Sequence, residues 1–248
     1  MTGRRKRRDG FDMKLVTYNV QSGRDAWGLL RLDGCCWMIK RLEPDILGLN
    51  ELRKCCADSG NVDQPAYIAE KTGLEHRFAK AIPMAGGEYG IGLFSRYPIT
   101  EFRVFPVPEV PLEEREPGYY EPRVIYRGVA DTPEGKLAVY GTHFGLTRPE
   151  RAYAVKLLME LLDSETLAHV FMGDLNMTPD DLLIGQIKGR LKDTHAPVPV
   201  LTCHTLKLDK TIDYIFVSGG IQADTARSYY SVASDHLPVS CNISISHA

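Results

Sequence analysis

Long apolar runs are missing from this chain. Of its 248 residues, 44% are hydrophobic and 25% are charged, but the apolar segments are short, and about 18–20 consecutive apolar residues are needed to cross a bilayer. The apolar stretch over residues 15–20 is interrupted by Thr17 and Tyr18, so it is also too short for the core of a signal peptide. We therefore predict no transmembrane segment and expect a cytoplasmic protein.

Cysteine motifs are missing as well. The six cysteines form no CxxC pair; they occur as two adjacent pairs, at residues 35–36 and 55–56, and as the single residues Cys203 and Cys241. This order matches neither the disulfide framework of a secreted domain nor a zinc site. We expect reduced thiols in the core or at its boundary.

A strongly basic body is also absent. Residues 1–12 contain five basic and two acidic side chains, and subtracting this +3 from the net charge of −2 leaves −5 for residues 13–248. An acidic domain is a weak candidate for tight, nonspecific binding to duplex nucleic acid, although this does not exclude a nuclease. The basic run over residues 4–8 could serve as a targeting or nucleic-acid arm. We favour a disordered basic tail over residues 1–12, or a start codon placed upstream of Met13, and a single domain over residues 13–248.

Short runs of β-branched and aromatic residues predict many strands and few helices. The clearest helix covers residues 148–162, where apolar side chains recur every three or four residues and Thr147 forms a capping box with Glu150. Further helices are predicted near residues 28–42, 64–72 and 179–188. The predicted strands lie at residues 14–20, 45–50, 90–95, 99–105, 123–130, 136–142, 168–173, 212–217 and 238–245. With no linker and no repeat, one α/β or α+β domain fits best.

One connection, residues 106–122, is long and rich in proline and glutamate. Connections of this length are often functional or mobile. Tyr119 and Tyr120 within it either stack on a base or line a substrate groove, or else pack against the apolar residues of their own loop.

Carboxylate, amide and imidazole side chains recur where these strands end. Each alone could cap a turn. A buried carboxylate without a partner costs several kcal/mol, so convergence on one site would satisfy all of them together. The residues concerned are Asn19, Asn50, Glu51, Asp174, Asn176, Asp213, Asp235 and His236.

The motifs around these residues resemble those of the endonuclease/exonuclease/phosphatase superfamily of metal-dependent phosphoesterases. In family order they read TYNV, LNEL, GIGLFSRYPI, GTHFG, GDLN, TIDYIF and SDHLPV, and the resemblance extends over nearly all of residues 13–245. It implies an α+β fold, a four-layer αββα sandwich of two mainly antiparallel sheets flanked by helices. The active site of such a fold lies along one rim of the strands.

The resemblance also implies a metal site. Glu51 matches the main metal-binding carboxylate, with Asn19 beside it and Asp235 completing the shell. Oxygen ligands of this kind suit Mg²⁺ or Mn²⁺. Asn50 stands where the family more often has glutamine. This difference lies next to the expected metal ligand, Glu51, and leaves the ligand itself unchanged.

The catalytic roles follow from the same resemblance. His236 matches the general base and Asp213 its partner, while Asp174 and Asn176 match the pair that positions the attacking water and contacts the scissile phosphate. Arg123 and His143 match donors to the phosphate oxygens, which stabilise negative charge in the transition state.

The remaining histidines and one further aspartate lie outside the motif residues to which the resemblance gives a role. We interpret His76, His169, His195, His204 and His247 as surface or structural residues. Asp193 has no chemistry that the sequence assigns.

These observations predict a Mg²⁺- or Mn²⁺-dependent hydrolase of phosphoric ester bonds, a phosphodiesterase or phosphatase. A small phosphodiester, a lipid head group or a nucleic acid could be the substrate. A histidine at position 143 is similar to the pattern of the deoxyribonuclease I, sphingomyelinase and inositol-phosphatase branches, and differs from that of abasic-site endonucleases. The segment before Asp213 disfavours the inositol 5-phosphatase branch. The alternatives are a DNA or RNA endo- or exonuclease of the same superfamily and a non-catalytic binding module, which the retained carboxylates and His236 disfavour.

Overall fold

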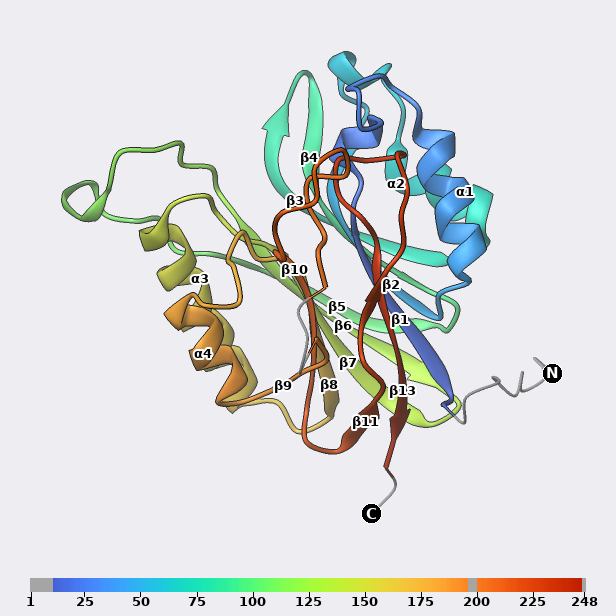
Figure 1. Ribbon diagram of the computed structural model, residues 1–248, viewed down its shortest axis with the longest axis vertical. Coiled ribbons are helices and arrows are strands. Elements are labelled where there is room, and N and C mark those ends of the chain that lie inside the picture. The colour runs from blue at the N-terminus through green and yellow to red at the C-terminus, as the bar shows by residue number, and fades with distance from the viewer. Residues whose placement is uncertain (1–10, 196–199, 247–248) are drawn as a thin grey trace.

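Two β-sheets packed face to face form the centre of the protein, and helices cover their outer faces (Figure 1). The structure is a computed structural model that describes residues 11–195 and 200–246. Helices α1 (Leu32–Leu42) and α2 (Gln64–Thr72) cover the first sheet, and α3 (Arg148–Asp163) and α4 (Leu182–Lys188) cover the second. The predicted four-layer α+β sandwich is confirmed.

The first sheet has the strand order β11-β13-β1-β2-β4-β3, with β12 paired to β13. Strands β1 and β2 are parallel, and the other pairs are antiparallel. Its strands are β1 (Met13–Asn19), β2 (Ile46–Lys54), β3 (Glu75–Met84), β4 (Gly87–Ser95), β11 (Ile221–Ala223), β12 (Arg227–Ser228) and β13 (Val239–Ile245).

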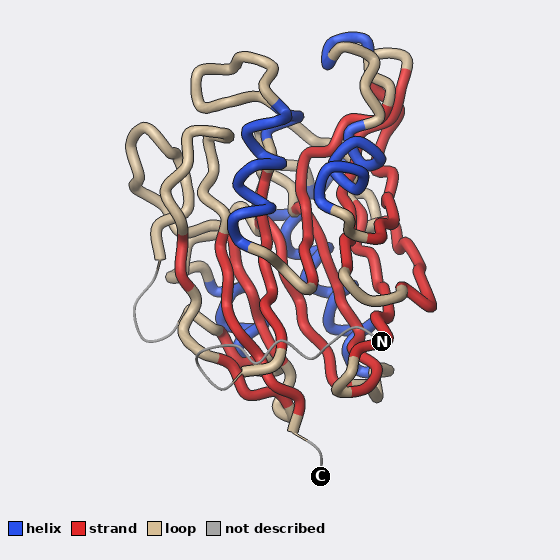
Figure 2. The backbone as a smooth tube through the Cα atoms, turned by 90° about the vertical axis from the view of Figure 1, so that its right-hand side faces the viewer, coloured by secondary structure: helices blue, strands red, loops and turns tan. Residues whose placement is uncertain are grey.

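The second sheet has the order β5-β6-β7-β8-β10-β9, in which only β7 and β8 are parallel. Its strands are β5 (Ile99–Pro106), β6 (Val124–Thr132), β7 (Gly135–His143), β8 (Ala168–Asp174), β9 (Lys192–Asp193) and β10 (Asp213–Val217). The carboxyl ends of the two parallel pairs lie at the same rim, which long loops surround (Figure 2).

Alternation of side chains along the strands divides the core into layers. Leu15, Leu93, Val139 and Met172 belong to the cluster between the sheets. The odd and even positions of one strand serve different layers: Val139 of β7 faces the other sheet, whereas Ala138 and Tyr140 face α3 and α4. This rigid double layer holds the strand ends in fixed positions.

Helix α3 begins with a capping box and buries one face against the second sheet. Thr147 accepts a hydrogen bond from the backbone N–H of Glu150, and the Glu150 carboxylate accepts one from the backbone N–H of Thr147, so the predicted capping box is present. Ala154, Val155, Leu158 and Leu162 are buried against the second sheet. The described part of the chain also contains 3₁₀ helices at Gln21–Gly23, Ala57–Ser59 and Leu112–Glu114.

The structure corrects the predicted start of two helices and adds one strand to the prediction. The helix predicted over residues 28–42 begins at Leu32, because Gly28, at φ +81°, belongs to a turn. The helix predicted over residues 179–188 begins at Leu182, after Asp181 accepts a hydrogen bond from the backbone N–H of Leu183. Strand β3 was not predicted, since most of its residues are half-buried or exposed and their apolar alternation is weak.

The cysteines are thiols throughout the chain: five are buried, Cys55 is exposed and none forms a disulfide. Within the described part of the chain, no helix has the length and apolar character to span a membrane. The basic run over residues 4–8 lies outside the described residues.

Two glycine substitutions test how tightly the sheets are packed. A Cβ at Gly141 would meet the buried ring of Tyr126, whereas a Cβ at Gly185 in α4 would meet open space. We expect Gly141→Ala to lower the free energy of unfolding by about 1–3 kcal/mol. Gly185→Ala should leave it unchanged or raise it by up to about 1 kcal/mol. Urea unfolding of both variants checks this, and equal effects would contradict it.

Candidate active site

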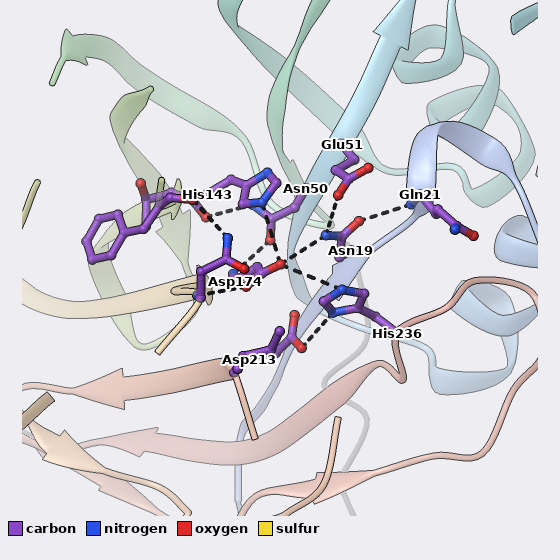
Figure 3. A network of polar contacts seen from close by, with 12 residues as sticks. Asn19, Gln21, Asn50, Glu51, His143, Asp174, Asp213 and His236 are labelled. Atoms are coloured by element: carbon purple, nitrogen blue, oxygen red, sulfur yellow. Dashed lines mark hydrogen bonds and ion pairs between the residues drawn. The ribbon is translucent and has the colours of Figure 1, made fainter. Parts of the chain in front are cut away.

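Asn19 is the last residue of β1, and Glu51 lies beside it inside β2, just past the last residue of β2 that pairs with β1. Asn19 is fully buried, and its side-chain amide donates to Glu51 Oε1 at 2.9 Å and to Asp174 Oδ2 at 3.1 Å. Its carbonyl oxygen accepts from the backbone N–H of Gln21 at 3.0 Å. Asn19 therefore joins a carboxylate of its own sheet to a carboxylate of the second sheet (Figure 3).

A β-bulge places Glu51. The register of β2 against β4 shifts between Leu49 and Leu52, and Glu51 has a left-handed backbone with φ +59°. Bulges of this kind redirect a side chain locally and are frequent beside active sites. Here the bulge brings the Glu51 carboxylate to the Asn19 amide.

Asn50 connects the two sheets. Its amide donates to the backbone carbonyl of Thr142 in β7 at 2.6 Å, and its carbonyl oxygen accepts from the backbone N–H of Asp174 in β8 at 3.1 Å. Both bonds are buried, so the residue next to the predicted metal ligand holds β2 against the ends of β7 and β8.

Asp174 lies at the centre of these contacts. Besides the Asn19 amide, its carboxylate accepts from the backbone N–H of Asn176 at 2.9 Å. Asn176 has φ +51°, and its side-chain amide donates to the backbone carbonyl of Phe144 at 2.9 Å. The GDLN segment thus forms a tight turn whose two polar side chains are fixed at the rim.

Asp213 comes from the second sheet, and His236 from the segment just before β13 of the first sheet. Asp213 is the first residue of β10 and lies opposite Asp174 in the β8–β10 register. Its Oδ2 atom is 2.9 Å from His236 Nδ1, while His236 Nε2 is 3.7 Å from Asp174 Oδ2. The imidazole therefore lies between two buried carboxylates (Figure 3).

Burial and mutual charge shift the pKa values in this cluster. Burial, with the neighbouring Asp213 charge, raises the pKa of Asp174 to about 7. Burial opposes the charged form of His236, but the charge of Asp213 and its hydrogen bond outweigh that effect and raise the pKa of His236 well above its usual value. Burial also raises the pKa of Glu51, against the hydrogen bond from Asn19.

His143 occupies the opposite wall of the site, at the end of β7. Arg123 Nη1 lies 3.1 Å from His143 Nδ1, and His143 Nε2 lies 3.6 Å from Asp174 Oδ2. A guanidinium can only donate, so Nδ1 is the acceptor and the ring proton is on Nε2. Burial, followed by the Arg123 charge, lowers the pKa of His143 well below its usual value, so this ring is neutral.

Tyr89 is a site residue that the sequence analysis missed. It comes from β4 of the first sheet, and its hydroxyl lies 3.5 Å from His143 Nδ1 in the second sheet. The Arg53 guanidinium lies over its ring, 5.5 Å from the centroid. Its only sequence signal is its position just before the GIGLFS motif.

The other residues weighed from the sequence lie elsewhere. His76 stacks on Phe94, and His169 Nδ1 contacts the carbonyl of Leu167. Asp193 is paired with His195 and Lys188. His204 is exposed, and His247 lies outside the described residues. On the long loop Tyr119 is exposed, whereas the ring of Tyr120 is covered by the Arg115 guanidinium at 4.8 Å.

The donor set fits a hard divalent cation. Glu51 is close enough to Asp235 and His236 for their charges to interact, and His236 is close to Asp213 and Asp174. Carboxylate and amide oxygens are what Mg²⁺ and Mn²⁺ prefer. The ligand atoms of Asp174, Asp213 and His236 also lie within 4.8 Å of one another in the described chain, but the bond between Asp213 and His236 Nδ1 already explains that cluster.

The raised pKa of Asp174 predicts a pH-dependent stability. Between about pH 4, where an unfolded aspartate titrates, and about pH 7, where Asp174 titrates, the folded protein binds more protons. The free energy of unfolding should therefore fall as the pH rises through this window. Urea unfolding in EDTA from pH 5 to 8 should show a shallower decline for Asp174→Asn. The exposed control Asp131→Asn should decline like the unaltered protein, and equal slopes for all three would contradict the assignment.

Solved structures share this fold at low sequence identity. An endonuclease/exonuclease/phosphatase from Beutenbergia cavernae superposes with a TM-score of 0.79 and 22% identity, over 95% of this chain and 72% of that one. A mannosyl-6-phosphatase from Bacteroides thetaiotaomicron gives 0.73 and 18%, over 94% and 100%. The human Nocturnin catalytic domain gives 0.68 and 16%, over 94% and 93%. A sequence search of curated proteins found no match.

A family profile matches most of the sequence. The Endonuclease/Exonuclease/phosphatase family profile aligns with residues 16–236, a range that begins in β1 and ends at His236. Members of this family are hydrolases of phosphoester bonds and generally depend on a divalent metal ion. The chain therefore belongs to the Endonuclease/Exonuclease/phosphatase family.

Proposed function

We propose that this protein is a Mg²⁺- or Mn²⁺-dependent hydrolase of phosphoric esters in which His236, oriented by Asp213, activates water. The observation that supports this most strongly is that His236 contacts Asp213 at 2.9 Å through Nδ1 and Asp174 at 3.7 Å through Nε2, beside the Asn19–Glu51 pair. Each of these groups is buried or half-buried at one rim.

Glu51, Asn19 and Asp235 are the residues that would hold the metal, and Asn19 would have to turn its carbonyl oxygen, which here accepts from the Gln21 backbone N–H, toward the ion. A divalent cation at these oxygens supplies Lewis-acid polarisation of the phosphate and offsets the negative charge of the site. The nearby carboxylates otherwise repel both one another and an incoming phosphate. Arg123 and His236 are the positive charges that favour the ionised form of Glu51.

Water activation requires a proton acceptor of fixed orientation. Asp213 accepts the Nδ1 proton of His236, which leaves Nε2 directed toward Asp174 and the space beside it. When His236 is neutral, Nε2 can take a proton from water, and Asp213 stabilises the imidazolium that forms. Asp174 and Asn176, fixed in their turn, would position that water and the scissile phosphate.

Negative charge on the phosphate would be stabilised from the opposite wall. His143 presents its Nε2 proton to the site, and Arg123 lies behind it. Both are almost fully buried, so they are held in place before a substrate arrives. Preorganised donors of this kind are worth roughly 10²–10³-fold in rate each.

We propose a small or lipid phosphoester as substrate rather than a nucleic acid. Residues 13–248 carry a net charge of −5, which disfavours a polyanion. The six unpaired cysteines suit a reducing compartment such as the cytoplasm. Turnover of sugar phosphates, nucleotides, phospholipids, DNA and RNA with Mg²⁺ and Mn²⁺ would separate a phosphatase or phosphodiesterase from a nuclease. No metal-dependent turnover of any of them, nor of bis-p-nitrophenyl phosphate, would favour a binding module.

The metal assignment predicts a chelator-sensitive activity. Hydrolysis of bis-p-nitrophenyl phosphate should stop in EDTA and return with Mg²⁺ or Mn²⁺. Glu51→Ala should lose more than the roughly 10–100-fold that removal of an outer-shell partner costs. Glu70→Ala, an exposed carboxylate of α2, is the matched control. Full activity of Glu51→Ala at ordinary metal concentration would refute the assignment.

The dyad assignment predicts strongly non-additive losses. His236→Ala and Asp213→Asn should each lower kcat by roughly 10²–10⁴-fold while the protein stays folded. Because the two residues act as one unit, the double variant should be scarcely slower than the slower single variant. Losses that multiply, or an Asp213→Asn variant that loses thermal stability at unchanged kcat, would show that Asp213 has a structural role only.

A further inference from the structure

Arg123 has a second neighbour that neither the motifs nor the proposed mechanism includes. The same Nη1 atom that contacts His143 lies 3.0 Å from Glu121 Oε1. The Arg123 and Glu121 side chains are only 8% and 9% exposed. This is a buried ion pair at the end of the long loop that precedes β6.

Burial makes this partner necessary. An isolated buried guanidinium would carry a large desolvation cost, because removing one member of a buried pair leaves an uncompensated charge. Arg123 without Glu121 would therefore tend to turn toward solvent, or toward the carboxylates at the centre of the site. Either movement would take it away from His143.

Glu121 is itself fixed by the first turn of α3. Its backbone N–H donates to Glu150 Oε1 at 3.2 Å, and Glu150 Oε2 accepts from the backbone N–H and hydroxyl of Thr147 at 3.1 and 2.8 Å. The capping box thus has a third partner in the loop. Gly118 of the same loop also approaches Thr147 so closely that a Cβ there would lie 2.6 Å from the threonine methyl carbon.

The chain of contacts ends at the reacting groups. Glu121 orients Arg123, Arg123 donates to His143 Nδ1, and this bond keeps the His143 proton on Nε2, which faces Asp174 Oδ2 at 3.6 Å. If Arg123 moved away, the His143 proton could shift to Nδ1. The ring would then present an acceptor, rather than a donor, to the phosphate.

We propose that Glu121 is a positioning residue that sets the orientation of Arg123 and, through it, the tautomer of His143. This inference rests on the proposed function, because it assigns Arg123 and His143 to the phosphate. It also gives the long loop a specific role, since the loop delivers Glu121 to the site and α3 holds it there.

Glu121→Gln tests the proposal because it keeps the side-chain shape and removes the charge. We expect kcat for bis-p-nitrophenyl phosphate to fall about 10-fold, less than the roughly 10²–10³-fold expected when the donor itself is removed in Arg123→Ala. KM should change little. Glu116→Gln, an exposed glutamate of the same loop, should match the unaltered protein. Circular dichroism and melting temperature verify that each variant is folded.

Two further measurements separate positioning from a structural role. In the Arg123→Ala background, Glu121→Gln should have no further effect on kcat, because its effect passes through Arg123. Imidazole ¹⁵N shifts should report the Nε2–H tautomer of His143 in the unaltered protein and a mixture in Glu121→Gln. Unchanged kcat, losses that multiply, or an unchanged tautomer would overturn the inference. If the unaltered protein hydrolyses no phosphoester, the proposed function fails, and the tautomer measurement still decides the role of Glu121.

Discussion

The Asp174 carboxylate, buried where the two sheets meet, is the constraint on which the rest of the site depends. It can be buried only because amides surround it: Asn19 comes from the first sheet, Asn50 contacts its backbone, and Asn176 closes the turn beneath it. The contacts of Asn19 and Asn50 join elements that are far apart in the sequence. Satisfying one buried charge therefore fixes the relative position of both sheets at the rim.

The remaining side chains are arranged around that carboxylate at similar distances. His236 and His143 present Nε2 atoms at 3.7 and 3.6 Å from the same Asp174 oxygen, from opposite sides. The pKa values of the two rings nevertheless shift in opposite directions. The charge of Asp213 favours the protonated form of His236, whereas the charge of Arg123 disfavours the protonated form of His143. Two histidines of similar burial thus acquire opposite pKa shifts from their second neighbours.

Helix α3, most of the strands and the convergence of the polar residues could be predicted from the sequence. The capping box of α3 and the apolar strands have strong local signals, and polar residues at successive strand ends predict convergence because parallel strands end at one edge. Strand β3 lacks such a signal, since its half-exposed residues do not alternate clearly. Tyr89 and Glu121 were missed for a different reason. Their importance lies in contacts across the sheets or from a loop, and neither residue type in isolation indicates such a contact.

The bulge in β2 has a consequence for how the LNEL segment can vary. In a regular strand, neighbouring side chains point to opposite faces, so Asn50 and Glu51 could not both serve one rim. The left-handed backbone at Glu51 removes that limit: Asn50 reaches β7, and Glu51 reaches Asn19. A β-branched residue at position 51 would therefore be excluded by its backbone as well as by its chemistry. Deleting one residue here would convert the bulge into a regular ladder and turn one of the two side chains away, even if every polar residue of the site were retained.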